Sequence, residues 1–190
     1  MGPYSPLTLS QEQYENIIKT VREGSDCFPP REWLANILIC EANLGIRVGD
    51  ILKLTPSSFV LDGERWRLNI IEEKTKKERK FTVPLILKQH LDIYCLKRRI
   101  GPRGKIFPMQ RDTVYKALRK VVKYLGYQNI STHSFRRFFA TNIYNNNGNK
   151  GQYKFYAESA ECYGVSLGYK YYSLPVYNSF YEEPICSEYQ

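Results

Sequence analysis

The chain has 190 residues, 43% of them hydrophobic, and its 28 lysines and arginines against 19 acidic residues give a formal net charge of +9. This length suits one domain with a real hydrophobic core, and the basic excess favours a polyanionic partner, although a basic surface also serves solubility alone. No apolar run approaches the roughly 18 residues that cross a membrane, and the N-terminus lacks the apolar core of a signal peptide, so we expect neither a membrane protein nor a secreted one.

The five cysteines are scattered, odd in number and without Cys-x-x-Cys spacing. A disulfide framework and a zinc site both use cysteines in regular pairs, so this pattern indicates neither. Together with the missing signal peptide, it predicts a protein of the reducing cytoplasm.

The first predicted helix covers Gln11–Glu23. The residues from Ser10 to Gln13 have the form of a capping box, and apolar residues follow at helical spacing. Gly24 is the kind of residue that ends a helix, which sets the second boundary.

The next two predicted helices lie on either side of Arg47. After a pair of prolines, the apolar stretch that begins at Trp33 predicts a deeply buried helix that ends near Gly45. Val48–Leu54 predicts another short helix. Arg47 would then be held at a rigid junction instead of on a free surface.

A small three-stranded antiparallel sheet is predicted between Thr55 and Pro84, where helical spacing gives way to strand-like alternation. An Asp62-Gly63 turn connects the first two strands. The second connection, residues 73–79, is charged and predicts a hairpin tip that reaches out from the body, with a merely solvated hairpin as the alternative. The expected strands are residues 59–61, 66–71 and 80–83.

Helical spacing returns over Leu85–Arg98 and Asp112–Leu125. The second of these helices has one apolar face and one basic face. Its basic residues are candidate contacts to a polyanion backbone, and a solvated helix face is the alternative for each of them. They are Lys116, Arg119, Lys120 and Lys123.

Residues 131–137 carry a distinct chemical signal. Ser131 or Thr132 suits the N-cap of a helix that ends in the polar cluster 145–149. His133 and Arg136 are three residues apart, which places them on one face of that helix. A guanidinium beside an imidazole suits a phosphate, and a solvated basic turn is the alternative. The expected buried side consists of Phe135, Phe138 and Phe139.

Three short motifs of this chain are informative together, in the order in which they occur. They are Leu44–Leu54 around Arg47, Lys74–Arg79 before Val83-Pro84-Leu85, and Thr132–Thr141 around His133 and Arg136. Together they resemble the catalytic domain of the tyrosine recombinases, the phage integrase family, over about Leu7 to Asn149. The resemblance implies an α+β fold, mostly helical with a small three-stranded antiparallel sheet. It also implies that the N-terminal core-binding domain of longer family members is missing.

The resemblance also implies a role for each matched residue. Arg47 and Arg136 would hold the scissile phosphate, with His133 assisting. Lys74 would be the general acid for the leaving 5′ oxygen, and Asp50 would support Arg47. Attack on a phosphodiester concentrates negative charge on the non-bridging oxygens, and two guanidiniums neutralise it without a metal.

Family members keep the bond energy in a phosphotyrosine, so the resemblance implies no ATP, no magnesium and no small-molecule cofactor. The implied partners are double-stranded DNA and other recombinase protomers bound to it, with no membrane involved. The expected location is cytoplasmic, in association with DNA.

The family's last motif, Leu-Gly-His followed at a short distance by the nucleophilic tyrosine, is absent from its expected place. His90 and His133 are the only histidines, so the second active-site histidine is missing. The nearest similarity is Leu167–Lys170, with Tyr177 eight residues after Tyr169, which makes Tyr177 the candidate nucleophile. Because the last 40 residues hold more than half of the 16 tyrosines, a tyrosine near this place is also expected by chance.

A frameshift is the other explanation for the C-terminal part. When residues 150–156 are back-translated and read one base later, the codons permit Lys-Asp-Asn-Ile-Asn-Phe-Met, which is similar to the usual continuation in the family. We therefore divide the chain into a catalytic domain, residues 1–149, and an atypical tyrosine-rich tail, residues 150–190, that is frameshifted or partly disordered.

Two main hypotheses of function follow. The first is a site-specific DNA recombinase or integrase of a phage or another mobile genetic element, which cuts and rejoins DNA through a 3′-phosphotyrosine intermediate. The alternative is a catalytically inactive DNA-binding remnant of an integrase that lacks the nucleophile segment. A basic structural or RNA-binding domain is a third class, and it would not need the ordered set of Arg, Lys and His-x-x-Arg.

Overall fold

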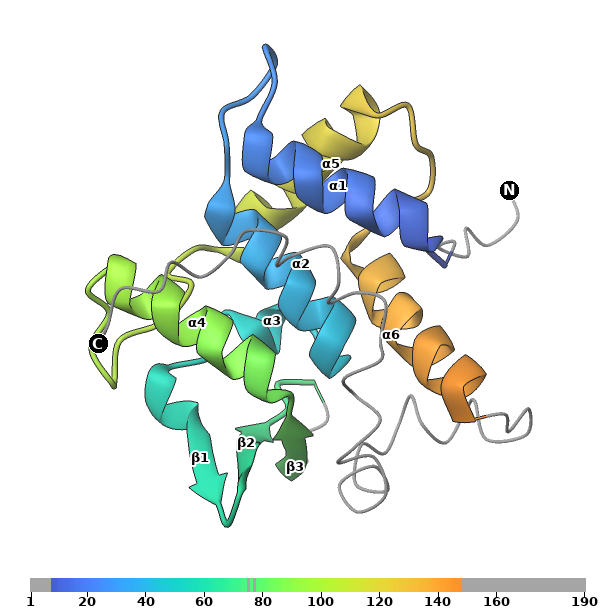
Figure 1. Ribbon diagram of the computed structural model, residues 1–190. Coiled ribbons are helices and arrows are strands. Elements are labelled where there is room, and N and C mark those ends of the chain that lie inside the picture. The colour runs from blue at the N-terminus through green and yellow to red at the C-terminus, as the bar shows by residue number, and fades with distance from the viewer. Residues whose placement is uncertain (1–7, 75, 77, 148–190) are drawn as a thin grey trace, which may run out of the picture.

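The computed structural model describes residues 8–74, 76 and 78–147 (Figure 1). Within these residues there are six α-helices and one small three-stranded antiparallel sheet, which confirms the predicted α+β, mostly helical fold. The first helix has the predicted bounds, and both hydrogen bonds of the Ser10 capping box are present. The elements are α1 (Gln11–Glu23), α2 (Glu32–Leu44), α3 (Val48–Ile51), the 3₁₀ helix η1 (Pro56–Ser58), β1 (Phe59–Asp62), β2 (Arg65–Ile71), β3 (Glu78–Val83), α4 (Leu85–Lys97), α5 (Arg111–Tyr124) and α6 (Thr132–Asn147).

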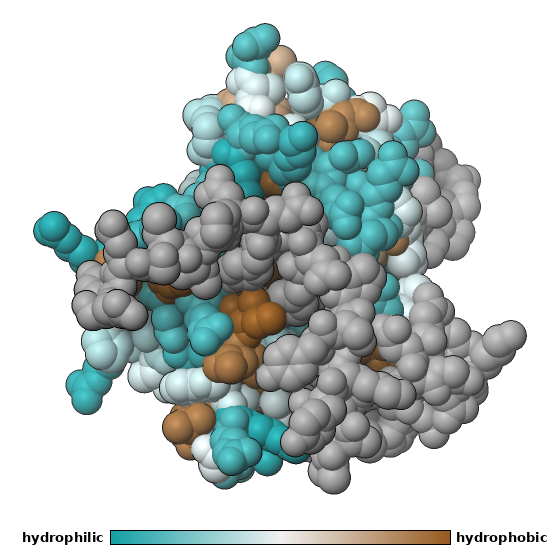
Figure 2. Space-filling view, viewed as in Figure 1, coloured by the Kyte–Doolittle hydropathy of each residue, from teal (hydrophilic) through white to brown (hydrophobic). Residues whose placement is uncertain are grey.

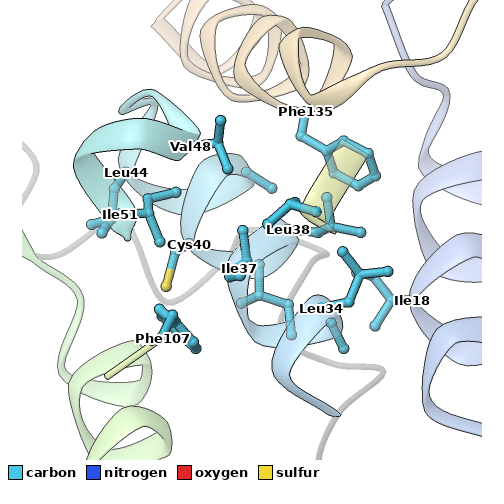
Figure 3. Close-up of a cluster of buried hydrophobic side chains, with 14 of the residues drawn as sticks. Ile18, Leu34, Ile37, Leu38, Cys40, Leu44, Val48, Ile51, Phe107 and Phe135 are labelled. Carbon is cyan, nitrogen blue, oxygen red and sulfur yellow. The ribbon is translucent and has the colours of Figure 1, made fainter. Parts of the chain in front are cut away.

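Helix α2 is the centre of the fold. Every residue from Leu34 to Leu44 is buried, and α2 packs against each of the other five helices (Figure 1). A helix that is buried on every side has no solvent face, so its stability depends on such a ring of neighbours. Figure 3 shows Ile37 and Leu38 of this helix between side chains from other elements, with Phe135 of α6 close by.

The sheet has the strand order β1-β2-β3, antiparallel throughout, and lies at one end of the helices (Figure 1). Asp62 pairs with Arg65, so the turn residues are Gly63 and Glu64, one position later than predicted. Gly63 has φ 60°, the left-handed conformation that a two-residue hairpin turn of this kind needs. One face of the sheet meets the core through Phe59, Leu68, Phe81 and Val83.

Three local predictions were wrong in detail. Helix α3 ends at Ile51 instead of Leu54, because the next amides bond three residues back and Pro56 disfavours a helix at Thr55. Helix α6 continues to Asn147, inside the predicted loop, since asparagine costs a helix only a fraction of a kcal/mol, about 0.5–0.7. Phe139 is only partly buried, whereas Phe135 and Phe138 are buried as predicted.

One face of the described surface is mainly polar. In Figure 2, hydrophilic residues cover most of the coloured area, and hydrophobic ones form small patches. The exposed apolar side chains of α4 are Leu85, Ile93 and Leu96. Among the described residues, no helix is long and apolar enough to span a membrane.

Candidate active site

Arg47 lies at the junction between α2 and α3, where the sequence predicts it. Helix α2 ends at Gly45 in the left-handed conformation, and Arg47 is the extended N-cap residue of α3. The side chain is 26% exposed, and its Nη1 lies 2.9 Å from Oε2 of Glu72. The backbone on both sides and this ion pair therefore restrict the guanidinium.

Arg136 comes to the same place from α6, which packs along α2 (Figure 1). Its Nε donates a hydrogen bond of 2.6 Å to the carbonyl oxygen of Gly45, two residues before Arg47. The ring of Phe139 lies against the Cα of Gly45, since a Cβ there would be 2.3 Å from Cδ1 of Phe139. Only glycine permits both the positive φ and this close approach.

The start of α6 is set by two serines. Thr132 is the first helical residue, so Ser131 occupies the N-cap position. The backbone N–H of Ser131 donates to Oγ of Ser134 at 3.2 Å, which is one half of a capping box. This start places His133 in the first turn and Arg136 in the second.

His133 is exposed on one side and surrounded by positive charge on the other. Partial burial is the largest cause that lowers the pKa of its imidazole, and the charges of Arg136, Arg47, Arg137 and Lys74 lower it further. The positive charges of three separate segments therefore act on the same imidazole. We call Arg47, Lys74, His133 and Arg136 the basic tetrad.

Burial also lowers the pKa of the Arg136 guanidinium, and Arg47 is the next cause. Two guanidiniums that repel one another across a partly exposed surface favour an anion between or beside them. The tetrad is therefore suited to a phosphate group, whose oxygens accept hydrogen bonds from arginine in a two-point geometry.

Lys74 lies exposed in the connection between β2 and β3. The N–H of Lys76 donates to the carbonyl oxygen of Glu72 at 2.9 Å, which closes a turn around Lys74. The backbone N–H of Glu73 donates to Oδ1 of the buried Asp50 at 2.9 Å. The backbone N–H of Asp50 donates to the carbonyl oxygen of Arg47 at 2.9 Å, whereas its side chain contacts the hairpin that carries Lys74.

Glu72 and Arg79 are site residues that the sequence did not single out. Glu72 is buried, and its Oε1 lies 3.2 Å from Nε of Arg79, while Oε2 contacts Arg47. Strand alternation carries the signal that could have found them, because side chains two residues apart share a face. Glu72 lies one residue past the end of β2 and continues the alternation of Leu68 and Ile70, and Arg79 precedes Phe81 on the inward face of β3.

Glu41 of α2 is a further buried acid close to the tetrad. Burial raises the pKa of its carboxyl well above the ordinary value, although a hydrogen bond from the Val48 amide and the charge of Arg136 act in the opposite direction. The charge of Glu41 acts in turn on Arg136, where it raises the pKa of the guanidinium and opposes the effect of burial.

Among the residues that the structure describes, no three His, Cys, Asp or Glu side chains come together as metal ligands. Tyr177, the candidate nucleophile, and the predicted tail, residues 150–190, lie outside the described residues. The described part of the chain thus contains the basic tetrad but not the candidate nucleophile.

Comparison with known proteins gives one family and one fold. Residues 8–151 match the family described as "Phage integrase family". A curated relative, the "Probable integrase/recombinase YoeC" of Bacillus subtilis (strain 168), is 26% identical over 143 residues, which cover 68% of this chain and 76% of YoeC.

Two solved structures are similar in fold. The pre-cleavage complex of the XerH site-specific recombinase bound to its difH substrate superposes with a TM-score of 0.60 at 16% identity, over 82% of this chain and 46% of the XerH chain. The lambda integrase catalytic core superposes with a TM-score of 0.55 at 23% identity, over 74% of this chain and 84% of the core. The chain thus spans less than half the length of XerH but most of a catalytic core.

Proposed function

This chain belongs to the phage integrase family, the tyrosine recombinases, and from that membership we propose that it is a site-specific DNA recombinase or integrase that cuts and rejoins DNA through a 3′-phosphotyrosine intermediate. The observation that carries the proposal is the basic tetrad, four cationic or titratable side chains from three distant segments that influence one another electrostatically. Double-stranded DNA is the proposed substrate, and other protomers of the recombinase are the proposed partners on it.

In the proposed reaction, Arg47 and Arg136 bind the non-bridging oxygens of the scissile phosphate. A tyrosine oxygen attacks the phosphorus, the bond to the 5′ oxygen breaks, and negative charge builds up on the non-bridging oxygens in between. Donors that already point at these oxygens lower the barrier, and loss of one such donor typically costs about 10²–10³ in rate. The bond of Arg136 to Gly45 and the pair of Arg47 with Glu72 support this kind of preorganisation.

Two proton transfers accompany the exchange of bonds. The tyrosine hydroxyl loses a proton as it attacks, and the leaving 5′ oxygen gains one. Lys74, exposed on its turn, is the proposed donor to the 5′ oxygen. The lowered pKa of His133 favours a neutral imidazole near pH 7, a form that can accept a hydrogen bond or a proton at the phosphate.

Tyr177 is the proposed nucleophile, because Leu167–Lys170 is similar to the start of the family's last motif and Tyr177 lies eight residues after Tyr169. The proposal of the other partners and of the cytoplasmic, DNA-associated location rests on family membership.

A catalytically inactive DNA-binding remnant is the second candidate function, favoured by the missing second histidine. Only His90 and His133 occur in the chain. His90 lies on α4 with Nε2 2.8 Å from Oδ1 of Asn36 on α2, which makes it a hydrogen-bond partner within the helical body. A remnant would bind phosphate at the tetrad without forming a covalent bond.

Covalent capture on DNA tests the proposal. The probe is a pool of nicked duplexes with varied central sequence, in which cleavage releases a short fragment and traps the 3′-phosphotyrosine adduct. We expect an adduct on a denaturing gel that Tyr177→Phe abolishes and that Tyr181→Phe, the matched tail control, leaves intact. Arg136→Lys keeps the charge but loses the two-point geometry, so it should slow adduct formation by about 10²-fold or more.

The other outcomes are equally informative. Salt-dependent DNA binding without any adduct contradicts the recombinase and favours the remnant. An adduct that survives Tyr177→Phe contradicts the assignment of the nucleophile, and the absence of both binding and adduct contradicts both candidate functions.

A further inference from the structure

The connection between β2 and β3 places two acidic residues, Glu72 and Glu73, directly before Lys74. Both contact basic side chains from other segments of the chain. A carboxylate beside a phosphate-binding guanidinium repels the incoming phosphate, so its benefit to such a site must come from geometry and not from charge.

Glu72 connects two arginines through its two oxygens. Oε2 lies 2.9 Å from Nη1 of Arg47, and Oε1 lies 3.2 Å from Nε of Arg79. The Glu72 side chain is 1% exposed and that of Arg79 is 14% exposed. Because the carboxylate is buried and also pairs with Arg79 of β3, a rotation of Arg47 away from Glu72 would leave a buried charge with one partner fewer, so the pair favours one arrangement of Arg47.

Glu73 fixes the same connection to the body of the domain. Its N–H bonds to Asp50, and its Oε2 lies 3.2 Å from Nζ of Lys53 and 3.3 Å from Nη2 of Arg111. Exposed ion pairs of this kind contribute little one by one, but here they add to a hydrogen bond on a buried carboxylate. The residue next to Lys74 is therefore tied to α3 and to the start of α5.

We propose that Glu72 is a positioning residue that sets Arg47 and the hairpin of Lys74 in register with each other. Glu72 contacts the guanidinium of Arg47, which is proposed to hold the phosphate. Two residues after Glu72 comes Lys74, whose amine is proposed to protonate the leaving oxygen. This inference rests on the proposed function for the roles of Arg47 and Lys74, and on the structure alone for their mutual restraint.

The first test concerns the restraint in the free protein. Rotation of an arginine guanidinium about its Cζ–Nε bond is measurable by nitrogen-detected NMR, and a buried ion pair slows it. We expect the guanidinium of Arg47 to rotate at least several-fold more slowly than that of the exposed Arg119. Glu72→Gln should remove the difference, and Glu78→Gln, on the same hairpin but exposed and paired with Lys80, should not.

Equal rotation rates for Arg47 and Arg119 in the wild-type protein overturn the proposal, and this comparison needs no variant. If Glu72→Gln does not fold, Arg79→Lys is the second variant. It leaves Glu72 beside Arg47 but removes the Nε contact, so rotation of Arg47 should become faster, and an unchanged rate contradicts the proposal.

The second test separates rate from affinity on the nicked duplex pool. With Glu72→Gln, adduct formation should slow by about 10- to 100-fold, the usual effect of a misplacement near 1 Å, while the DNA dissociation constant stays equal or falls. Weaker binding at an unchanged rate contradicts a positioning role. If the wild-type protein forms no adduct, the recombinase proposal fails, whereas the NMR comparison and the direction of the affinity change still decide the role of Glu72.

Discussion

Replacement of Gly45 by alanine tests how closely α6 and α2 are fitted at the site. Gly45 has φ 61°, and a Cβ would lie 2.3 Å from Cδ1 and 2.5 Å from Cε1 of Phe139. The left-handed backbone costs a non-glycine residue about 1–2 kcal/mol, and overpacking adds about 1–3 kcal/mol, so Gly45→Ala should lower the free energy of unfolding by about 2–5 kcal/mol.

The assay is urea denaturation followed by circular dichroism, with Gly63→Ala as the matched control. Gly63 has φ 60°, but no heavy atom lies within 4 Å of a Cβ built there, so only the backbone cost of about 1–2 kcal/mol applies. In a Phe139→Ala background, the cost of Gly45→Ala should fall toward that of the control, since the clashing ring is gone. Equal costs for Gly45→Ala and Gly63→Ala in the wild-type background would refute the packing argument.

The carbonyl oxygen of Gly45 also accepts the Nε bond of Arg136. A shift of the backbone at Gly45 should therefore weaken DNA binding, which electrophoretic mobility shifts can measure. Gly63→Ala should leave binding unchanged, because Gly63 lies at the tip of the first hairpin, and a loss there would contradict the link.

Three further measurements probe the charges. Each basic residue of α5 that contacts a DNA phosphate should lower the slope of log K against log salt by about 0.9 when it is replaced by glutamine, and an unchanged slope marks a solvated side chain. Because the pKa of His133 is lowered in the folded protein, the unfolded chain takes up a proton at a higher pH than the folded one. The free energy of unfolding should therefore fall as the pH drops below about 6.5. His133→Gln should make this fall smaller but not abolish it, because the pKa of His90 is lowered as well. Asp92→Asn should cost about 1–3 kcal/mol in urea denaturation, because the buried Lys88 ammonium, 2.6 Å from Oδ1 of Asp92, loses a charged acceptor, and Lys88→Met in the same chain should recover most of the loss. The α5 residues to replace are Lys116, Arg119, Lys120 and Lys123.

The parts of the fold that could be predicted depend on neighbours in sequence. The capping box at Ser10 and the glycine after Glu23 set both ends of α1, and both signals lie within a few residues of the boundary. The end of α3 could not be predicted in the same way, since Ile51, Leu52 and Leu54 all face inward whether the backbone is helical or turns. Burial alone does not distinguish the two backbones.

The same dependence on neighbours in sequence explains which residues of the candidate site could be predicted. Arg47, Lys74, His133 and Arg136 could be singled out because each lies in a short motif. The partners of Glu72 and Glu73 come from distant segments, and residues 73–79 by themselves have the composition of a solvated charge run. Only the strand alternation past Ile70 predicts that Glu72 points inward, and it does not say which basic residues it meets.

The basic tetrad brings positive charges together, and their repulsion raises the free energy of the folded state. Repulsion between Arg47 and Arg136 contributes to the lowered pKa of Arg136, and both contribute to that of His133. The apolar packing of α6 on the other side supplies the opposing free energy, with the ring of Phe138 stacked 5.0 Å from that of Tyr14 and Phe135 fully buried. Since the side chains are already assembled against their own repulsion, we expect a bound phosphate to relieve that repulsion, which is what the proposed reaction requires of a site for a transient pentavalent phosphate.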